Sequence, residues 1–256
     1  MPIDYVKRDR IGLVTINRPE ALNCLNLSDL EELGRVWLDF IGDEELRVAV
    51  LTGAGDRAFS TGADLKELIP RLSSGEIRVP QTMPGFLKNV DCFKPIIAAV
   101  NGACLAGGME ILQATDIRVA VEEATFGLAE VKWGLFPTAG STVRLTRQIP
   151  FAWAMEILLT GDPITADQAL SIGLINRVVP REKLMETAMV YAEKLARNGP
   201  LAVQAIKEAV LRAYDAPTAQ AYYLEAFLAQ GVFLSEDARE GPRAFVEKRK
   251  PEFKGK

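Results

Sequence analysis

The first half of the chain alternates short apolar runs with segments of helical or small-residue character. Residues 11–17 have the pattern of a strand, and residues 3–8 provide a hairpin partner for it. Residues 47–52, 96–100 and 117–121 are further runs rich in Val, Ile and Ala, which is typical of buried strands. Strands that alternate with helices predict an α/β fold.

Two other segments of this half carry local signals. Residues 28–31 (Ser-Asp-Leu-Glu) form a capping-box pattern, which predicts a helix from there to about Ile41. Residues 70–90 contain several prolines and a Ser-Ser-Gly run. We expect this segment to be a surface loop or a mobile lid, either functional or merely tolerated.

Beyond Pro150 the apolar positions recur with helical spacing. One short strand, at residues 174–179, interrupts this pattern. The chain therefore consists of an α/β part, to about residue 150, and a helical part that packs on it or on a neighbouring molecule. The expected helices span residues 151–159, 165–172, 181–197, 201–214, 218–233 and 238–248.

The composition is that of a soluble, foldable chain. It has 256 residues, of which 48% are hydrophobic and 25% charged, enough for a sizeable core. The net charge of −4 provides no overall basic field that would favour nucleic acid. No signal-peptide pattern and no apolar run of about 20 residues occur, so we expect no membrane association and a cytoplasmic protein. Cys24, Cys92 and Cys104 lack metal or redox spacing, and we expect free thiols.

The chain contains no histidine, which removes several classes of active site. Ser-His-Asp and Cys-His mechanisms are excluded, as are zinc sites built on histidine. If the protein uses acid–base chemistry near neutral pH, carboxylates are its natural carriers, with Lys, Tyr or Cys behind them.

Two small-residue runs, residues 59–65 and 101–110, are the strongest candidates for a site. Gly107 lies where a strand gives way to a helix, so its backbone amide has no partner within that helix. Glu110 follows three residues later on roughly the same face. With a second amide from Ala63, such a hole would stabilise an oxyanion, and removal of one donor costs about 3–4 kcal/mol. The alternative is that the glycines allow close packing and that Glu110 faces water.

Two weaker motifs do not change this interpretation. Residues 53–55 (Gly-Ala-Gly) follow a strand as a dinucleotide loop would, but the third glycine of that fingerprint is missing. Residues 248–250 (Lys-Arg-Lys) could bind phosphate or could be a solvated basic helix end.

Several motifs in a fixed order resemble the crotonase superfamily, the enoyl-CoA hydratase/isomerase family. The resemblance covers nearly the whole chain, and the order makes it more specific than any single motif. The matching segments are residues 17–23, 59–67, 99–110, 160–164 with 169–176, and 245–250.

The resemblance implies a crotonase-like spiral of ββα turns over residues 1–195 and a helical region over residues 196–256. In this family the helical region forms homotrimers, often paired as a dimer of trimers, and covers the coenzyme A. The implied substrate is an acyl-CoA thioester, with no metal or redox cofactor beyond the coenzyme A of the substrate itself. Neither nucleic acid nor membrane is an implied partner.

By position, the resemblance implies the roles of particular residues. The Ala63 and Gly107 amides would hold the thioester oxygen as an enolate. Residues 126–130 match the segment that supplies a second catalytic acid, Glu130. We expect Glu110 to hold and activate water and Glu130 to transfer a proton. The residues expected to bind substrate and coenzyme A are Ala21, Asn23, Ala63, Asp64, Leu65, Lys66 and Gly107, with Phe245 and Lys248 reaching the adenine end from the same or a neighbouring subunit.

Because both acids are present, we expect an enoyl-CoA hydratase that adds water syn across the double bond of a 2-enoyl-CoA to give a 3-hydroxyacyl-CoA. An isomerase or an aromatic acyl-CoA hydratase-lyase on the same enolate hole is the alternative, and a non-enzymatic RNA- or partner-binding protein is a third reading. Two departures affect the acyl pocket. Ala129 stands where the family commonly has proline, and residues 133–140 are bulkier than in many members, with a tryptophan that some hydratase-lyases share.

Overall fold

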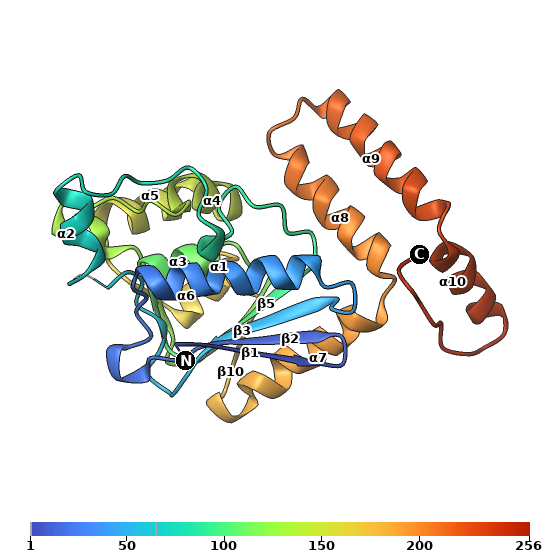
Figure 1. The fold of residues 1–256 in the computed structure, drawn as a ribbon, viewed down its shortest axis with the longest axis horizontal. Helices are drawn as coiled ribbons and strands as arrows, with labels where there is room; N and C mark the ends of the chain where they lie inside the picture. The colour runs from blue at the N-terminus through green and yellow to red at the C-terminus, as the bar shows by residue number, and fades with distance from the viewer. Residues whose placement is uncertain (1, 65) are drawn as a thin grey trace.

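A six-stranded sheet lies at the centre of the body of the molecule, with helices on both of its faces (Figure 1). The computed structural model describes residues 2–64 and 66–256. The strand order is β1-β2-β3-β5-β7-β10, with β1 and β2 antiparallel and the others parallel. β3 and β5 are apolar runs because a central parallel strand is covered on both faces. The bounds are β1 Ile3–Arg8, β2 Ile11–Ile16, β3 Val48–Gly53, β5 Ile96–Val100, β7 Ile117–Val121 and β10 Arg177–Val179.

Four short strands form a second sheet in the order β4-β6-β8-β9. Each of β4, β6 and β8 directly follows a strand of the first sheet, and a helix or helical turn comes next. This recurring unit confirms the expected ββα architecture. Strands of two or three residues carry too little periodicity to be recognised in the sequence. They are β4 Ala58–Ser60, β6 Ala103–Leu105, β8 Thr125–Gly127 and β9 Ile164–Thr165.

Helices cover the sheets and complete the core. α1 contributes Leu33, Trp37 and Phe40 to the interior, and α7 packs on β3, β5 and β7. The α-helices are α1 Leu27–Gly42, α2 Leu68–Ser73, α3 Gly107–Leu112, α4 Ser141–Gln148, α5 Phe151–Thr160, α6 Ala166–Ser171, α7 Leu184–Arg197, α8 Pro200–Ala213, α9 Thr218–Phe233 and α10 Glu236–Val246. Single 3-10 turns are η1 Pro19–Ala21, η2 Pro84–Phe86, η3 Ala129–Trp133 and η4 Arg181–Lys183.

Two local expectations need correction. The capping box of α1 is made by Asn26 and Asp29, not by Ser28 and Glu31. The Asn26 side chain accepts from the Asp29 amide, and the Asp29 carboxylate accepts from the Asn26 amide. Residues 70–90 are not all loop, because they include most of α2 and the whole of η2.

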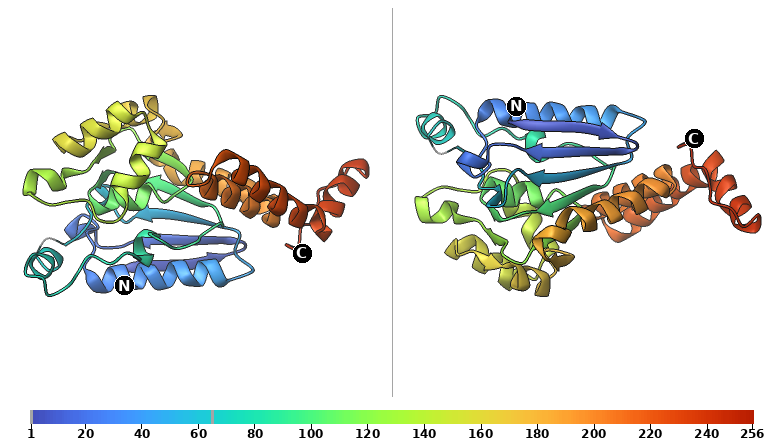
Figure 2. Two further views of the ribbon diagram at one scale, coloured as in Figure 1. Left: turned by 90° about the horizontal axis from the view of Figure 1, so that it is seen from above. Right: turned by 90° about the horizontal axis from the view of Figure 1, so that it is seen from below.

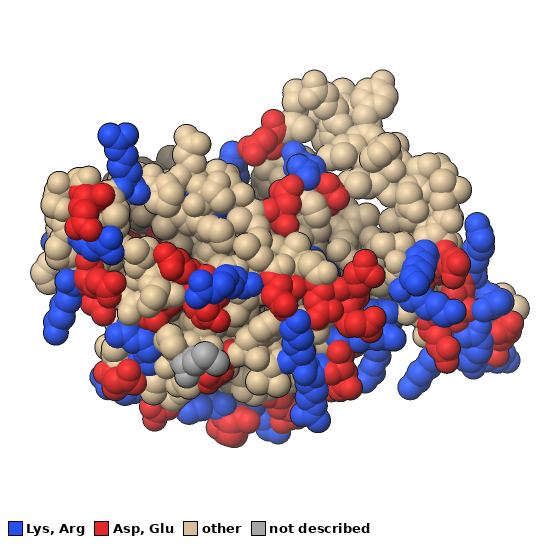
Figure 3. Space-filling view, in the orientation of Figure 1, with Lys and Arg blue, Asp and Glu red and all other residues tan. Residues whose placement is uncertain are grey.

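Helices α8, α9 and α10 extend away from the sheets as an arm (Figures 1 and 2). No residue of α9 is buried. Its exposed face carries Tyr222, Tyr223, Phe227 and Phe233, and Figure 3 shows few charges over this part of the molecule. Within the described residues no helix combines the length and apolarity needed to cross a membrane. The expected division of the chain at residue 195 falls inside α7, near its end.

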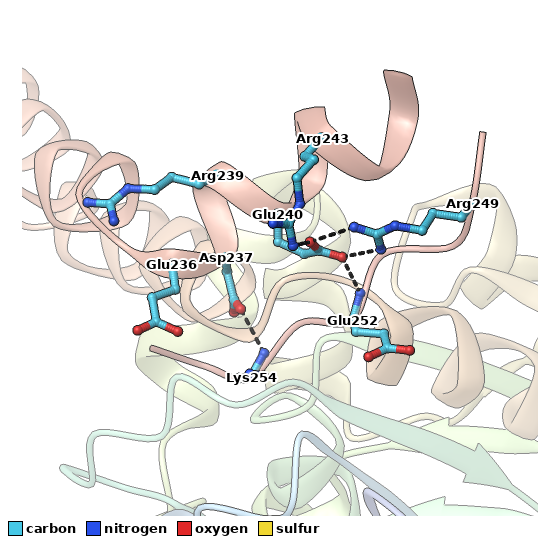
Figure 4. Close-up of a pocket in the computed structure, with 8 residues that line it drawn as sticks. All are labelled: Glu236, Asp237, Arg239, Glu240, Arg243, Arg249, Glu252 and Lys254. Carbon is cyan, nitrogen blue, oxygen red and sulfur yellow. Dashed lines mark hydrogen bonds and ion pairs between the residues drawn. The ribbon is translucent and has the colours of Figure 1, made fainter. Parts of the chain in front are cut away.

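The C-terminal tail, residues 247–256, folds back against α10 (Figure 4). The Glu240 carboxylate accepts hydrogen bonds from Arg243 and Arg249 and from the Glu252 amide. The Arg249 hydrogen bonds, followed by that amide, hold the pKa of Glu240 well below its usual range. Arg47, directly before β3, donates to the carbonyls of Ala196 in α7 and Phe253 in the tail, so the tail also contacts the six-stranded sheet region.

Candidate active site

The two small-residue runs meet at a contact that only glycine permits. A Cβ on Gly62 would lie 2.4 Å from the Gly107 nitrogen, and one on Gly108 would lie 2.2 Å from the Ser60 oxygen. Gly62 also has a φ of +87°, which side chains rarely adopt. The end of β4 and the start of α3 are therefore in direct backbone contact, as the sequence interpretation required.

Two backbone amides next to this contact, both in residues that line one cavity, have no acceptor in the described part of the chain. Among the described residues, neither the Ala63 nor the Gly107 N–H donates to any acceptor. Ala106, just before Gly107, has a φ of +48°, a strained value for a residue with a side chain. Strain of this kind persists where the surrounding structure enforces it. An oxygen atom between the two amides could accept both hydrogen bonds.

Glu110 lies on α3 with one carboxylate oxygen fixed. The side chain is 4% exposed, and its Oε1 accepts from the amides of Ala139 (2.8 Å) and Ser141 (3.2 Å) at the start of α4. Burial raises the pKa of Glu110 to about 7. That net pKa already includes the Ser141 amide, which lowers it, the negative charge of Glu130, which raises it, and the Ala139 amide and Arg144, which lower it. Glu110 can therefore gain or lose a proton near neutral pH.

Glu130 lies in the turn η3, and one oxygen of its carboxylate accepts no hydrogen bond from the described residues. Its Oε2 is buried and has no hydrogen-bond partner among the described residues. Burial raises the pKa of Glu130, with its own backbone amide opposing the shift. A buried polar atom without a partner is uncommon, and at a cavity it indicates an atom that a ligand or a transferred proton satisfies.

Both carboxylates and both amides line one cavity of about 430 Å³. Glu110 and Glu130 are the only ionisable side chains among its described lining residues, and most of the others are apolar. The lining residues are Thr61, Ala63, Leu68, Ile69, Leu72, Ser73, Val79, Met83, Phe86, Leu105, Ala106, Gly107, Glu110, Ala129, Glu130, Trp133, Gly134, Leu135, Phe136 and Thr138. Such a cavity can stabilise an oxyanion and move protons in a water-poor environment.

The other expected binding residues have different surroundings. Asn23 is fully buried, and its side chain donates to Ala54 and Ala58 and accepts from Arg18, so it supports the fold and has no free polar atom for a ligand. The Asp64 carboxylate lies 3.6 Å from Arg18. Ala21 is half-buried at the end of η1, Lys66 is exposed, and Leu65 lies outside the described residues.

Phe245 and Lys248 do not lie at the cavity of their own chain. Both are exposed, at the end of α10, on the arm. Lys248 has a φ of +56° and ends the helix in a left-handed turn. One chain therefore brings together Ala63, Gly107, Glu110 and Glu130, but not the two C-terminal residues.

The residues whose amides bind the Glu110 carboxylate were not predicted from the sequence. Ala139 and Ser141 lie 29 and 31 residues beyond it in the chain. The only signal was Gly140 followed by a helical pattern, since the first amides of a helix are free donors. Nothing in the sequence showed that these amides point at Glu110.

Comparisons with known proteins agree on one family. The sequence model described as Enoyl-CoA hydratase/isomerase matches residues 7–256. An enoyl-CoA hydratase of Mycobacterium tuberculosis is 42% identical over 98% of this chain and 95% of its own length. The (E)-benzylidenesuccinyl-CoA hydratase of Thauera aromatica is 41% identical over the whole of both chains. A carnitinyl-CoA dehydratase of Citrobacter koseri is 39% identical over 99% of this chain and 98% of its own.

Solved structures show the same similarity. The enoyl-CoA hydratase of Bacillus anthracis superposes with a TM-score of 0.94 at 37% identity, covering 100% of both chains. An enoyl-CoA hydratase of M. tuberculosis gives a TM-score of 0.92 at 38% identity, covering 100% of this chain and 99% of the other.

The proximity of the two acids predicts a coupled titration. In the wild-type protein, we expect Glu110 and Glu130 to titrate in two overlapping steps. In Glu130→Gln the repelling charge is gone, so the pKa of Glu110 should fall, on the order of half a pH unit, and give a single step. Carbon-13 NMR of protein labelled at the glutamate carboxyl carbon measures this. Glu31→Gln, at an exposed position on α1, is the control, and an unchanged or higher Glu110 midpoint in Glu130→Gln would contradict the coupling.

Proposed function

The chain belongs to the enoyl-CoA hydratase/isomerase family, and from that premise we propose that it hydrates a 2-enoyl-CoA thioester to a 3-hydroxyacyl-CoA by syn addition of water. The observation that carries the proposal is the pair of carboxylates in one apolar cavity. One of them has a single oxygen tied by amides, and the other has a buried oxygen with no partner. Addition of water needs a proton acceptor and a proton donor side by side.

The two backbone amides provide the electrostatic part of this mechanism. The thioester oxygen accepts hydrogen bonds from Ala63 and Gly107, which polarises the double bond and stabilises the enolate formed when water adds at Cβ. Each such donor contributes about 10²–10³-fold in rate. Because Gly62 packs on Gly107, the spacing of the two donors is set before substrate arrives.

The carboxylates move the protons. Glu110, ionised, takes a proton from water through its Oε2 while the water oxygen bonds to Cβ. Glu130, protonated, gives its proton to Cα. The sum is one water added to the double bond, and proton exchange between the two acids restores the starting state. The pKa of Glu110, raised to about 7, keeps both of its protonation states accessible near neutral pH, and burial also raises the pKa of Glu130, which favours its protonated form.

The coenzyme A portion needs its own binding residues, of which Ala63 and Gly107 line the cavity. We assign this role to Ala21, Ala63, Asp64, Leu65, Lys66 and Gly107, and to Phe245 and Lys248 of a neighbouring subunit. The second pair comes from a neighbour because it lies on the arm, away from the cavity of its own chain. The assigned groups perform the reaction without a metal or redox cofactor, and we propose a cytoplasmic enzyme.

A hydratase for a bulky or aromatic acyl group is the second candidate within this family. Trp133 and Phe136 line the cavity yet are 73% and 67% exposed, so they present exposed aromatic surface to an acyl chain. Rates on crotonyl-CoA and cinnamoyl-CoA separate the two candidates.

Replacing either acid by its neutral isostere should abolish most turnover. We expect Glu110→Gln and Glu130→Gln each to lower kcat by about 10²–10⁴-fold, because each removes one proton-transfer step. Steady-state hydration of crotonyl-CoA measures the rate, and circular dichroism checks the fold. Glu31→Gln, at an exposed position on α1, is the control. Normal turnover in either active-site variant would remove the role assigned to that residue.

The exposed aromatic face of the arm supports a homotrimer or a dimer of trimers. Contiguous apolar surface of this kind on a folded chain marks a protein interface. A neighbour that covers it would also bring its own Phe245 and Lys248 to a second cavity, which fits the position of these residues away from their own site.

Sedimentation equilibrium should therefore give three or six times the chain mass of 28.0 kDa. The double substitution Tyr223→Lys with Phe227→Lys should give smaller species, because it places charges in the interface. Val6→Lys, an exposed apolar position on β1, should leave the mass unchanged. A wild-type monomer at micromolar concentration would contradict the assembly.

A further inference from the structure

The position of the Glu110 carboxylate depends on where α4 begins. Its Oε1 accepts from two amides, those of Ala139 and Ser141, on either side of Gly140. No side chain caps this end of α4. Any movement of α4 relative to α3 would therefore change how Glu110 is held, and with it which carboxylate oxygen faces the cavity.

Side chains fix α4 against α3 at both of its ends. At the start of α4, Gln113 Nε2 donates to Ser141 Oγ at 2.9 Å. At its end, Gln148 Nε2 donates to the Gln113 carbonyl at 2.8 Å, and Arg118 donates to the Gln148 side chain at 2.9 Å. The buried Arg118 also donates to the carbonyls of Thr115 and Leu174. The end of α3 is thus the reference against which α4 is placed.

The Gln113–Ser141 bridge is not the arrangement that stability alone would favour. Gln113 is 2% exposed, and its Oε1 is buried without a partner among the described residues. A buried polar atom left unpaired destabilises a fold, whereas an apolar pair of the same shape has no such cost. The unpaired atom is a cost in stability, which points to a functional role of the bridge. Ser141 is next to Gly140, which lies between the two amides that bind Glu110, so this role would concern the position of Glu110.

We propose that Gln113 and Ser141 are positioning residues for hydration, which hold the start of α4 so that Glu110 Oε1 stays tied to two amides and Oε2 alone faces the reacting water. This inference rests on the proposed hydratase function. Neither side chain lines the cavity, so neither touches substrate. The bridge acts through Glu110, and its loss should change proton transfer and leave substrate binding intact.

Ser141→Ala tests the bridge cleanly, because it removes the hydroxyl but keeps the Ser141 amide that binds Glu110. We expect kcat on crotonyl-CoA at pH 7 to fall about tenfold, with KM within about twofold of wild type. Weaker amide contacts favour the protonated acid, so the acid limb of the kcat profile should move to higher pH, by about half a unit. Thr146→Ala removes another hydroxyl of α4, bonded only to the Val143 carbonyl, and should behave as wild type.

The double variant Ser141→Ala with Gln113→Leu separates positioning from stability. Ser141→Ala alone leaves Gln113 Nε2 without its acceptor, so it should lower the melting temperature. Replacing both partners by apolar groups removes the unpaired atoms, so the melting temperature of the double variant should be that of wild type or above. If the bridge positions Glu110, kcat and the acid limb stay displaced although stability has recovered.

A double variant with the wild-type pH profile and kcat would overturn the inference, and so would a Ser141→Ala profile that matches wild type. These outcomes differ from failure of the proposed function, in which the wild-type enzyme hydrates neither crotonyl-CoA nor cinnamoyl-CoA and both conclusions fall together.

Discussion

The backbone of β4 touches the backbone of α3, and the rest of the site depends on that contact. Because Gly62 and Gly108 have no side chains, the backbone segments that carry the Ala63 and Gly107 amides can touch. The same contact sets the origin of α3, and three residues along it Glu110 enters the cavity. A methyl group at either glycine would push the two segments apart. Donor spacing and acid position would then change together.

This arrangement buries the carboxylates of Glu110 and Glu130 in one cavity, and their burial lowers the free energy of unfolding. Glu110 has a folded-state pKa of about 7 against an ordinary value of 4.5, so ionising it is less favourable in the fold than in the unfolded chain. The resulting destabilisation is absent below pH 4.5, grows as the pH rises, and is complete above pH 7, where it is on the order of 3 kcal/mol. The unpaired Oε2 of Glu130 adds to it. These features weaken the fold, and they are also what makes proton transfer near pH 7 possible.

The parts of this site that the sequence predicted are those encoded locally. Gly107 and Glu110 are three residues apart, so a strand-to-helix transition was enough to place them on one side of a helix. The meeting of β4 with α3 is a long-range contact, and it was predictable only because two glycine runs and the family resemblance indicate it. The long-range contacts of Glu110 carry no such signal and were not predictable. The amides of Ala139 and Ser141 reach Glu110 only through the packing of α4 on α3.

The same distinction applies to the fold. The long apolar strands and the amphipathic helices follow from periodicity, whereas β4, β6, β8 and β9 exist because neighbouring turns of the spiral align their backbones. The cap of α1 was misplaced because two overlapping capping patterns occur within residues 26–31 and tertiary packing selects the first. Asn23 was expected to bind the ligand, but both polar atoms of its side chain form hydrogen bonds to the backbone of Arg18, Ala54 and Ala58.

The central claim is that this cavity adds water to an activated thioester. Incubating the wild-type protein with crotonyl-CoA in ¹⁸O-labelled water, with absorbance and product mass recorded together, tests it most directly. We expect loss of the conjugated enoyl-thioester band and a product heavier by one labelled water. The same experiment with cinnamoyl-CoA tests for a preference for a larger acyl group. An unchanged band with both thioesters, or a product of unchanged mass with a shifted double bond, would contradict hydration.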